Sequence, residues 1–426
     1  MVSTVPNHVA TINANFFDHE FLVDPYPTYA LLREHEPVHW NDRLNGWVLT
    51  RHSDVYDAHL EPETFSSERL GAMLLDRITP DSSIQVQKFM RIAPEWMLFR
   101  DPPDHTRVRK LMNQEFRTRD IKRLGPQMAD VVSELIDDML EKREFDLVTD
   151  FAYQVPGRVL AAQYGLPKRD AVLLTDWWYQ IRNMQRIFLG AEPQNVAPAG
   201  SPVGIAFDDM RAYLDDLVRD RRKSPKDDLV SRVALYPEGF GRDGQRLSED
   251  EMFAHLMLLP LASFGTTMDL ITNGLLGLLT QRDQWELIKA GPGLIPSAVE
   301  EVLRFDASVQ LTHRLATRDV EVAGVHIREG ELVFLVRGAA NRDPSRWTDP
   351  DRIDVTRADS AHGHVGFGVG IHHCLGAGLA RAEVAAAYAA LAERVPDLRL
   401  CPGRPHVWKA DTPQFRGLNR LPALAG

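Results

Sequence analysis

Cysteine is scarce in this chain of 426 residues, which contains only Cys374 and Cys401. Two cysteines cannot build the disulfide framework of a small secreted domain, so a reducing compartment is expected. A basic excess is also missing, because 49 Lys and Arg face 60 Asp and Glu, and the net charge is −11. Without a basic footprint the chain is not expected to bind nucleic acid.

A leader segment and a pair of membrane spans are missing as well. The first 20 residues show no basic start followed by an apolar run, so the chain is expected in the cytoplasm without a membrane anchor. The one long apolar stretch, Leu256 to Leu279, has Asp269 as its only formal charge and is long enough to span a bilayer. Pro260 and Ser263 interrupt it and no second stretch accompanies it, which favours a buried core helix.

The composition is that of an ordinary folded protein, with 44% hydrophobic and 26% charged residues. Apolar residues recur at helical spacing over Ile121 to Arg143 and Met210 to Lys223, and an alanine-rich helix is expected from Leu375 to Arg394. No internal repeat or low-complexity linker divides the chain. The sequence therefore predicts a mainly α protein with a small β region, formed as one domain over residues 1–426.

The β region is expected in two places. Pro37 to Trp40 and Gly46 to Thr50 flank a short polar turn and predict a hairpin. Three more short strands are expected at Val320–Val322, Val325–Ile327 and Leu332–Val336. Between the helices, Gly190 to Gly204 is rich in Gly, Pro and Ala and predicts a surface loop.

The segment from Phe367 to Gly376, Phe-Gly-Val-Gly-Ile-His-His-Cys-Leu-Gly, carries the chemistry. Cys374 lies just before a predicted helix, whose N-terminal N–H groups favour the thiolate, the form that ligates a metal. Glycines let the loop approach a flat surface closely. A lone thiolate on such a loop is what a haem iron with an axial thiolate requires. The alternative is a buried structural cysteine.

Two other chemistries are open to the same segment. His362, His364, His372, His373 and Cys374 form a His/Cys cluster that zinc would accept, although the spacing matches no finger or helical His pair. Gly368-Val-Gly370 begins like a dinucleotide-binding loop, but the third glycine would fall at His373. Neither pattern is complete.

The whole segment resembles the cysteine-ligand loop of the cytochrome P450 family, whose pattern Phe-Gly-x-Gly-x-His-x-Cys-x-Gly is present in full. The resemblance implies the P450 fold, haem b with Cys374 as axial ligand of the iron, and oxygenase activity. It also implies a charge cluster of Glu301 and Arg304 with Arg352 as third member. The cofactor contacts that it implies are Phe367, Gly368, Cys374 and Gly376 in the loop, and His105, Arg109, Arg314 and His372 toward the haem propionates.

The long apolar helix resembles the family's oxygen-binding helix but departs from its pattern. In Ala262-Ser-Phe-Gly-Thr266 the family's alcohol is present as Thr266, whereas Gly265 replaces the acid and Ser263 replaces a glycine. Proton delivery would then run through Thr266, Thr267, Ser263, water or the substrate. Together with Ala307-Ser-Val-Gln310, this departure keeps variant chemistry open, either peroxide-driven oxidation or the nitration of aromatic rings.

The substrate pocket can be placed only by the same resemblance. Trp178 and Phe264 would offer aromatic walls, and Arg182 with Arg186, four residues apart, would suit a carboxylate, although solvated surface is the simpler interpretation. The expected substrate contacts are Trp178, Arg182, Leu261, Phe264, Val309 and Phe415.

Partners follow from the same interpretation. No reductase domain is expected within the chain, so electrons would come from an external ferredoxin or flavodoxin and its reductase. Residues 107–123 hold seven Lys or Arg against two acids, which suits docking of an acidic protein, or simply forms a solvated helix face. We expect a monomeric haem-thiolate monooxygenase acting on a small organic molecule, with a non-catalytic haem or zinc protein as the rival.

Overall fold

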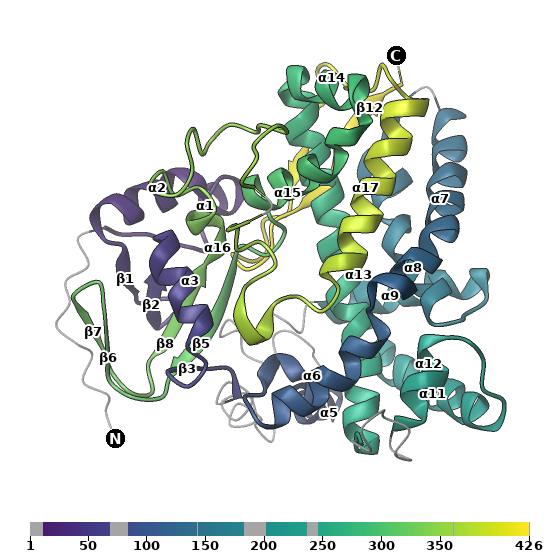
Figure 1. The fold of residues 1–426 in the computed structure, drawn as a ribbon, viewed down its shortest axis with the longest axis horizontal. Coiled ribbons are helices and arrows are strands. Elements are labelled where there is room, and N and C mark those ends of the chain that lie inside the picture. Colours follow the sequence, from purple (N-terminus) through teal and green to yellow (C-terminus); the bar gives the residue numbers. More distant parts are fainter. Residues whose placement is uncertain are drawn as a thin grey trace.

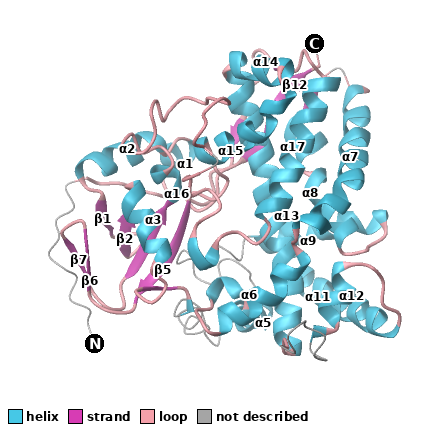
Figure 2. Ribbon diagram, viewed as in Figure 1, coloured by secondary structure: helices cyan, strands magenta, loops and turns pink. Residues whose placement is uncertain are grey.

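The computed structural model describes residues 12–68, 84–142, 144–182, 202–236, 246–360 and 362–425. Helices dominate, and the strands gather mainly on one side of the molecule (Figure 2). The longer helices are α2 (Tyr26–His35), α3 (His52–Leu60), α5 (Ile84–Ile92), α6 (Asp104–Met112), α7 (Thr118–Leu140), α8 (Gln154–Gln163), α9 (Ala171–Ile181), α11 (Pro202–Lys223), α13 (Glu249–Thr280), α14 (Arg282–Ala290), α15 (Ile295–Phe305) and α17 (Ala377–Arg394). Shorter ones are α1 (His19–Val23), α12 (Leu229–Ala234) and α16 (Arg337–Ala340).

The main sheet has five strands in the order β1-β2-β8-β5-β3. These strands are β1 (Val38–Asn41), β2 (Gly46–Leu49), β3 (Phe65–Ser66), β5 (Leu311–Ala316) and β8 (Leu332–Val336). Only the β2–β8 pair is parallel, and β1–β2 forms the predicted hairpin. Because β5 follows α15 directly and β8 leads into α16, the sheet delivers residues from both connections to the centre of the molecule.

Three small sheets complete the β region. A two-stranded sheet joins β6 (Val320–Val322) to β7 (Val325–Ile327), and another joins β10 (Val407–Trp408) to β11 (Leu418–Arg420). In the third, β12 (Pro422–Leu424) lies between β4 (Phe145–Asp146) and β9 (Arg399–Leu400). The bounds of β6, β7 and β8 match the predicted strands, so the turn signals placed these strands correctly.

Helix α13 is the long apolar stretch of the sequence and runs through the helical half of the molecule (Figure 1). Ser248 and Glu251 form a capping box at its start, which satisfies two otherwise free backbone N–H groups. Within the described residues it is the one helix long and apolar enough to cross a bilayer, and 83% of its most apolar window is buried. The prediction of a core helix is confirmed.

The other helical predictions can be compared with the structure in the same way. Helices α7, α11 and α17 coincide with the predicted segments to within a few residues at most ends. The start of α11 at Pro202 lies eight residues before the predicted start, so the end of the expected Gly190–Gly204 loop is helical instead. Residues 190–201 of that loop lie outside the described residues. The prediction of a single domain stays a prediction.

Close packing around α13 fixes the geometry of the centre. A Cβ on Gly274 would lie 1.8 Å from the Tyr388 hydroxyl of α17, so these two helices meet at a glycine. Tyr388 then lies within 3.3 Å of the Leu270 and Ile271 carbonyls of α13 and hydrogen-bonds them. This packing fixes the position of α17, and with it the loop that precedes α17, beside the middle of α13.

Candidate functional site

A large cavity lies between α13 and the loop that precedes α17, and its sides are closed by residues 308–314, which lead into β5, and by the segments that follow α9 and β10. Most residues that the sequence singles out are brought together here. Those that line the cavity are Arg109, Trp178, Arg182, Leu261, Ser263, Thr266, Thr267, Val309, Arg314, Phe367, His372, Cys374, Gly376 and Phe415. These residues come from segments that are far apart in the sequence, and the fold brings them together around one cavity.

The cysteine loop is shaped by its glycines. Gly368 and Gly370 have φ of +67° and +71°, in the left-handed region that side chains disfavour. A Cβ on Gly368 would lie 2.8 Å from the Arg337 guanidinium, so glycine is also needed for space. The loop closes where the Cys374 N–H donates to the Phe367 carbonyl at 2.9 Å. This turn presents Cys374 to the cavity.

A network around Glu300 of α15 anchors that loop from behind. Arg381 donates two hydrogen bonds to the Glu300 carboxylate, at 2.6 and 2.9 Å, and His364 lies 3.0 Å from the same group. Arg381 also stacks on Phe367, with its guanidinium carbon 4.7 Å from the ring centroid. Burial alone would raise the pKa of Glu300, but the hydrogen bonds from His364 and Arg381 hold it at about 2. The two segments that flank the loop are thus tied to α15 through a charged carboxylate, and Arg381 extends this network to Phe367 in the loop.

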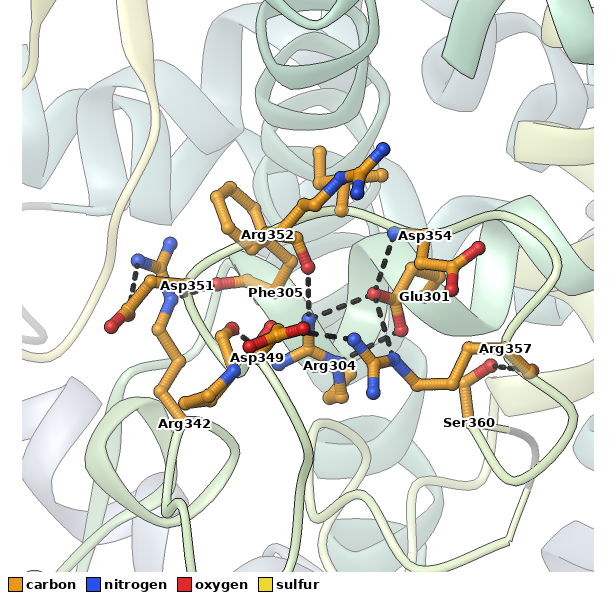
Figure 3. Close-up of polar contacts among 12 residues, drawn as sticks. Glu301, Arg304, Phe305, Arg342, Asp349, Asp351, Arg352, Asp354, Arg357 and Ser360 are labelled. Carbon is orange, nitrogen blue, oxygen red and sulfur yellow. Dashed lines mark hydrogen bonds and ion pairs between the residues drawn. The ribbon is translucent and has the colours of Figure 1, made fainter. Parts of the chain in front are cut away.

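The next residue of α15 serves a second network (Figure 3). Glu301 and Arg304 are both fully buried and form two hydrogen bonds of 2.8 Å. Arg304 donates further to the carbonyls of Asn341, Pro350 and Arg352, at 2.8 to 3.0 Å. Its donors are therefore satisfied without water, as a buried guanidinium requires. The Glu301–Arg304 pair lies where the sequence predicts it.

The third member of this cluster is Arg357, and the assignment of Arg352 is wrong. Arg357 Nε lies 3.2 Å from Glu301 Oε1. The Arg352 side chain points away (Figure 3) and pairs with Asp283 at 3.2 Å, with 62% of it exposed. Only the backbone carbonyl of Arg352 reaches Arg304. Residues 350–357 have no periodic pattern that would tell which of two arginines turns inward.

The electrostatics at Cys374 differ from the expectation that the helix N-terminus alone holds a thiolate. Burial raises the pKa of the Cys374 thiol, and a hydrogen bond from the Gly376 N–H with the charges of Arg109, Arg337 and Arg381 offsets only part of this. The protein by itself therefore favours the neutral thiol. A bound cation at this sulfur would supply the missing stabilisation, since a metal deprotonates a coordinating thiol.

Beside Cys374 lies a cradle of basic side chains, which we define as His59, His105, Arg109, Arg314, Arg337 and His372; the last four line the cavity, and His59 and His105 adjoin them. The His105 and His372 rings lie 4.5 Å apart, and burial is the main cause that lowers the pKa of both, to about 4 for His105. Burial also lowers the pKa of Arg314 to about 10 and that of Arg337 to about 9. Burial therefore destabilises the cationic form of all four groups, and the charge of Asp101 offsets only part of this for His105 and Arg314.

Several buried nitrogens of the cradle also lack a hydrogen-bond partner among the described residues. Within the described ranges, no hydrogen-bond partner is found for four sets of buried nitrogens: both ring nitrogens of His59, both of His105, His372 Nε2 and Arg337 Nε. Among the described residues, no carboxylate lies within ion-pair distance of Arg109, Arg314 or Arg337. Buried donors without acceptors are costly. The cradle is built for anionic oxygens that the protein does not itself supply.

Comparison with known proteins identifies a family with this architecture. The family model "Cytochrome P450" matches residues 293–395. The chain is 36% identical to "Cytochrome P450 107B1" of Saccharopolyspora erythraea over 96% of this chain and 97% of that one. It is 35% identical to "Vitamin D(3) 25-hydroxylase" of Pseudonocardia autotrophica, with 97% and 96% covered. The chain belongs to the cytochrome P450 family.

Solved P450 structures have the same fold. The crystal structure of CalO2 superposes with a TM-score of 0.85 at 30% identity, covering 96% of this chain and 98% of that one. P450BioI, solved in complex with a hexadec-9Z-enoic acid ligated acyl carrier protein, gives 0.84 at 31% identity, with 95% and 99% covered. The predicted fold class is confirmed. The protein is a haem-thiolate oxidoreductase of the P450 monooxygenase class.

The cavity fits the family's haem b. Haem carries an iron that takes an axial thiolate and two propionates, which need buried donors or cations. Cys374 supplies the sulfur, and the cradle supplies orphaned donors beside it. At Gly376 a Cβ would meet no protein atom within 4 Å, so this glycine leaves space on the cavity wall that a flat group can fill.

The packing of α13 against α9 explains why no acidic residue precedes Thr266. A Cβ on Gly265 would lie 2.0 Å from Trp178 Cζ2, so the indole of α9 fills the space that an Asp or Glu side chain needs. Nearby, Thr266 Oγ1 donates to the Ala262 carbonyl and Ser263 Oγ to the Leu259 carbonyl, both at 2.7 Å. In this P450 the family's acid is replaced by an aromatic side chain from another helix.

All but one of the six expected substrate contacts line the cavity, and the exception is Phe264. Phe264 is only 1% exposed and packs between Tyr153 and Trp178, with ring centroids at 5.1 and 4.7 Å, so it lies behind the cavity wall. Val309 and Phe415 form a β-bridge and line the cavity together. The family resemblance indicated the correct helix for Phe264 but not which face of that helix borders the cavity.

Several site residues escaped the sequence analysis. Arg337 and His59 belong to the cradle, and Asp269 and Lys409 form a buried pair on the cavity wall at 2.5 Å. Arg186 lies outside the described residues. The zinc interpretation fails because, in the described part of the chain, no group of three His, Cys, Asp or Glu is arranged to hold a metal ion. Asp269 was visible as a lone charge in an apolar helix, and that signal pointed to a buried partner.

Proposed function

We propose that this P450 hydroxylates or epoxidises a small, mainly apolar organic molecule. The observation that carries the proposal is one cavity in which Cys374, the acid-free cradle and the hydroxyls of α13 meet an apolar wall. Cys374 would be the axial ligand, and His105, Arg109, Arg314, Arg337 and His372 would hold the propionates. Bound there, haem with an axial thiolate supplies the activation of dioxygen.

The residues of this chain position the reactants and hold protons. Thr266 and Ser263 line the cavity while their hydroxyl protons rest on backbone carbonyls, so each oxygen can accept a hydrogen bond from water or substrate. With Gly265 in place of an acid, we propose that protons pass through Thr266, Thr267 and Ser263 with water. Leu261, Val309, Trp178 and Phe415 supply apolar surface that excludes bulk water.

For electrons, we propose an external ferredoxin or flavodoxin with its reductase. Lys110, Arg119, Lys122 and Arg123 are exposed on α6 and α7, and Ile121 of α7 lies close to Gly378 at the start of α17. The basic surface is smaller than the sequence suggests, because Arg109 lines the cavity and Arg107 pairs with Glu251. We also propose a cytoplasmic monomer, which its two free cysteines suit.

The second candidate is variant chemistry, either peroxide-driven oxidation or the nitration of an aromatic ring. The packing of Trp178 against Gly265 favours it. The absence of an acid at position 265, directly before Thr266, suits an enzyme that receives its oxygen as peroxide or that transfers a nitrogen oxide to an aromatic ring. Turnover with hydrogen peroxide in the absence of any reductase would support this candidate. Turnover that requires a ferredoxin and its reductase, with one oxygen atom from O₂ in the product, supports the first.

The experiment that tests the family chemistry in this chain is the absorption spectrum of the reduced, carbon-monoxide-bound protein. We expect a strongly red-shifted Soret band that the Cys374→Ser variant loses together with oxygenase activity. The Cys401→Ser variant is the matched control and should keep both. A histidine-type band in the wild type, or retention of the red-shifted band in Cys374→Ser, would refute the ligand assignment.

A further inference from the structure

The far wall of the cavity carries four charged side chains from three segments. Arg182 follows α9, Asp269 lies on α13, and Lys409 and Asp411 follow β10. They form two ion pairs of different strength. Lys409 lies 2.5 Å from Asp269 and both are less than 9% exposed, whereas Arg182 lies 3.4 Å from Asp411 and these two are 21% and 37% exposed.

The Asp269–Lys409 pair is a fixed part of the wall. A Cβ on Gly417 would lie 2.0 Å from Asp269 Oδ1, so the carboxylate packs directly on the backbone of β10 and β11, where Lys409 N–H donates to the Gly417 carbonyl. Opening a buried pair of this kind leaves two uncompensated charges. A ligand therefore gains nothing by competing for Lys409.

Arg182 differs from Lys409, because one of its hydrogen-bond donors is unused. Arg182 Nε is buried and, among the described residues, has no acceptor within hydrogen-bond distance. Its guanidinium lies within cation–π range of two rings, with its central carbon 5.5 Å from the Trp178 ring centroid and 5.1 Å from that of Tyr179. A planar guanidinium fixed in this way presents several N–H groups in one plane, which matches the oxygens of a carboxylate or phosphate.

Among the four charged side chains of this wall, the hydrogen-bonding group without a partner in the described residues is a donor, Arg182 Nε–H, and this favours an anionic ligand. Asp411 is the more exposed partner and lies beyond ordinary hydrogen-bond distance of Arg182, so water can solvate it when it is displaced. An incoming anion would satisfy buried Nε–H and lose little by replacing Asp411. An incoming cation would have to compete with both Arg182 and Lys409.

We propose that the substrate is an amphipathic anion, with an apolar body against Leu261 and Val309 and a carboxylate or phosphate group bound by Arg182. Asp411 is the internal carboxylate that this group displaces. The inference rests on the proposed function, because it names the substrate class of the same cavity, and it makes Arg182 a residue that determines specificity.

The test compares three ligands with the same ten-carbon body, decanoate, decyl phosphate and decan-1-ol, by isothermal titration calorimetry with the haem-loaded protein. We expect at least one anion to bind roughly ten- to hundredfold more tightly than the alcohol, the range expected for a hydrogen-bonded charge pair. The preferred anion identifies the head group. Equal binding of the alcohol and both anions would overturn the proposal.

Two variants change this preference in opposite directions. Arg182→Gln should abolish the preference for the anion while leaving decan-1-ol binding unchanged, and Asp411→Asn should tighten anion binding severalfold by removing the competitor. Arg169→Gln, which removes a guanidinium that is 85% exposed ahead of the same helix, is the matched control. Retention of the preference in Arg182→Gln, or weaker anion binding in Asp411→Asn, would overturn the proposal.

The carbon monoxide spectrum of each variant, recorded before titration, shows that the protein is folded around its haem. It also separates the two proposals. A wild type with the thiolate band and no anion preference refutes only the substrate class, whereas a wild type without that band refutes the proposed function.

Discussion

Two regions border the same cavity and treat charge in different ways. Behind the cysteine loop, Glu300, Glu301 and Arg304 are buried and hold several short hydrogen bonds each. On the far wall, Arg182 and Asp411 form one long, half-exposed pair. Buried, saturated networks are costly to break, whereas exposed single pairs contribute little to stability and rearrange readily. The first region therefore preserves geometry, and the second is free to recognise a ligand.

Removing Arg304 should break the first region most severely. Arg304→Met leaves Glu301 buried with Arg357 as its remaining cationic partner and should lower the free energy of unfolding by about 3–5 kcal/mol. Arg352→Met is the control, because its exposed side chain pairs only with Asp283, and it should change stability by less than about 0.5 kcal/mol. Urea denaturation of the haem-loaded proteins measures both. Equal losses would contradict the correction from Arg352 to Arg357.

The Glu300 network should reveal itself in the pH dependence of stability. The pKa of Glu300 falls from its ordinary 4.5 to about 2 in the folded protein, so its stabilisation is complete above pH 4.5 and is lost as the pH falls toward 2. Glu300→Gln should cost roughly 3 kcal/mol at neutral pH, and the difference from wild type should shrink below pH 4.5. Urea midpoints from pH 7 to pH 3.5 follow this change. A difference that stays constant over this range would show that the charge is not responsible.

At the boundary of the two regions, the Trp178–Gly265 contact predicts a coupled pair of mutations. Gly265→Asp places a side chain where the indole lies and should cost about 1–3 kcal/mol through overpacking. In Gly265→Asp/Trp178→Ala the two costs should partly cancel, because the new side chain fills the space that the indole leaves. A double-mutant cycle on the free energy of unfolding measures this coupling. Strict additivity would mean that the two sites do not share space.

The smallest effect on stability is expected in the second region. Arg182→Gln should lower the free energy of unfolding by less than about 1 kcal/mol, since its pair with Asp411 is long and half-exposed. The same variant is expected to change ligand preference at least tenfold, so stability and binding should separate. A stability loss as large as that of Arg304→Met would place Arg182 in the scaffold instead.

The features that the sequence predicts correctly are those that spacing along the chain determines. The Phe367–Gly376 loop and the Glu301–Arg304 pair are local patterns, in which spacing along the chain already determines geometry, and both appear where expected. Arg357, Arg337 and the contact of Trp178 with Gly265 depend on which loop or helix face turns toward a distant segment. No spacing in the sequence encodes such a choice. For the same reason, the sequence analysis placed Phe264 on the cavity wall, whereas its side chain lies behind that wall.

Glu300 and Glu301 are consecutive residues of α15 that serve two separate networks, one to His364 and Arg381, which flank the cysteine loop, and one to residues 341–357. Consecutive helical side chains point about 100° apart, so one rotational setting of α15 satisfies both networks at once. Since His364 and Arg381 flank the cysteine loop on either side, the loop cannot move away from α15 together with both flanks without leaving Glu300 charged and unpaired. Its amide protons should exchange with solvent only in the opening event that also releases α15, making loop and helix one cooperative unit.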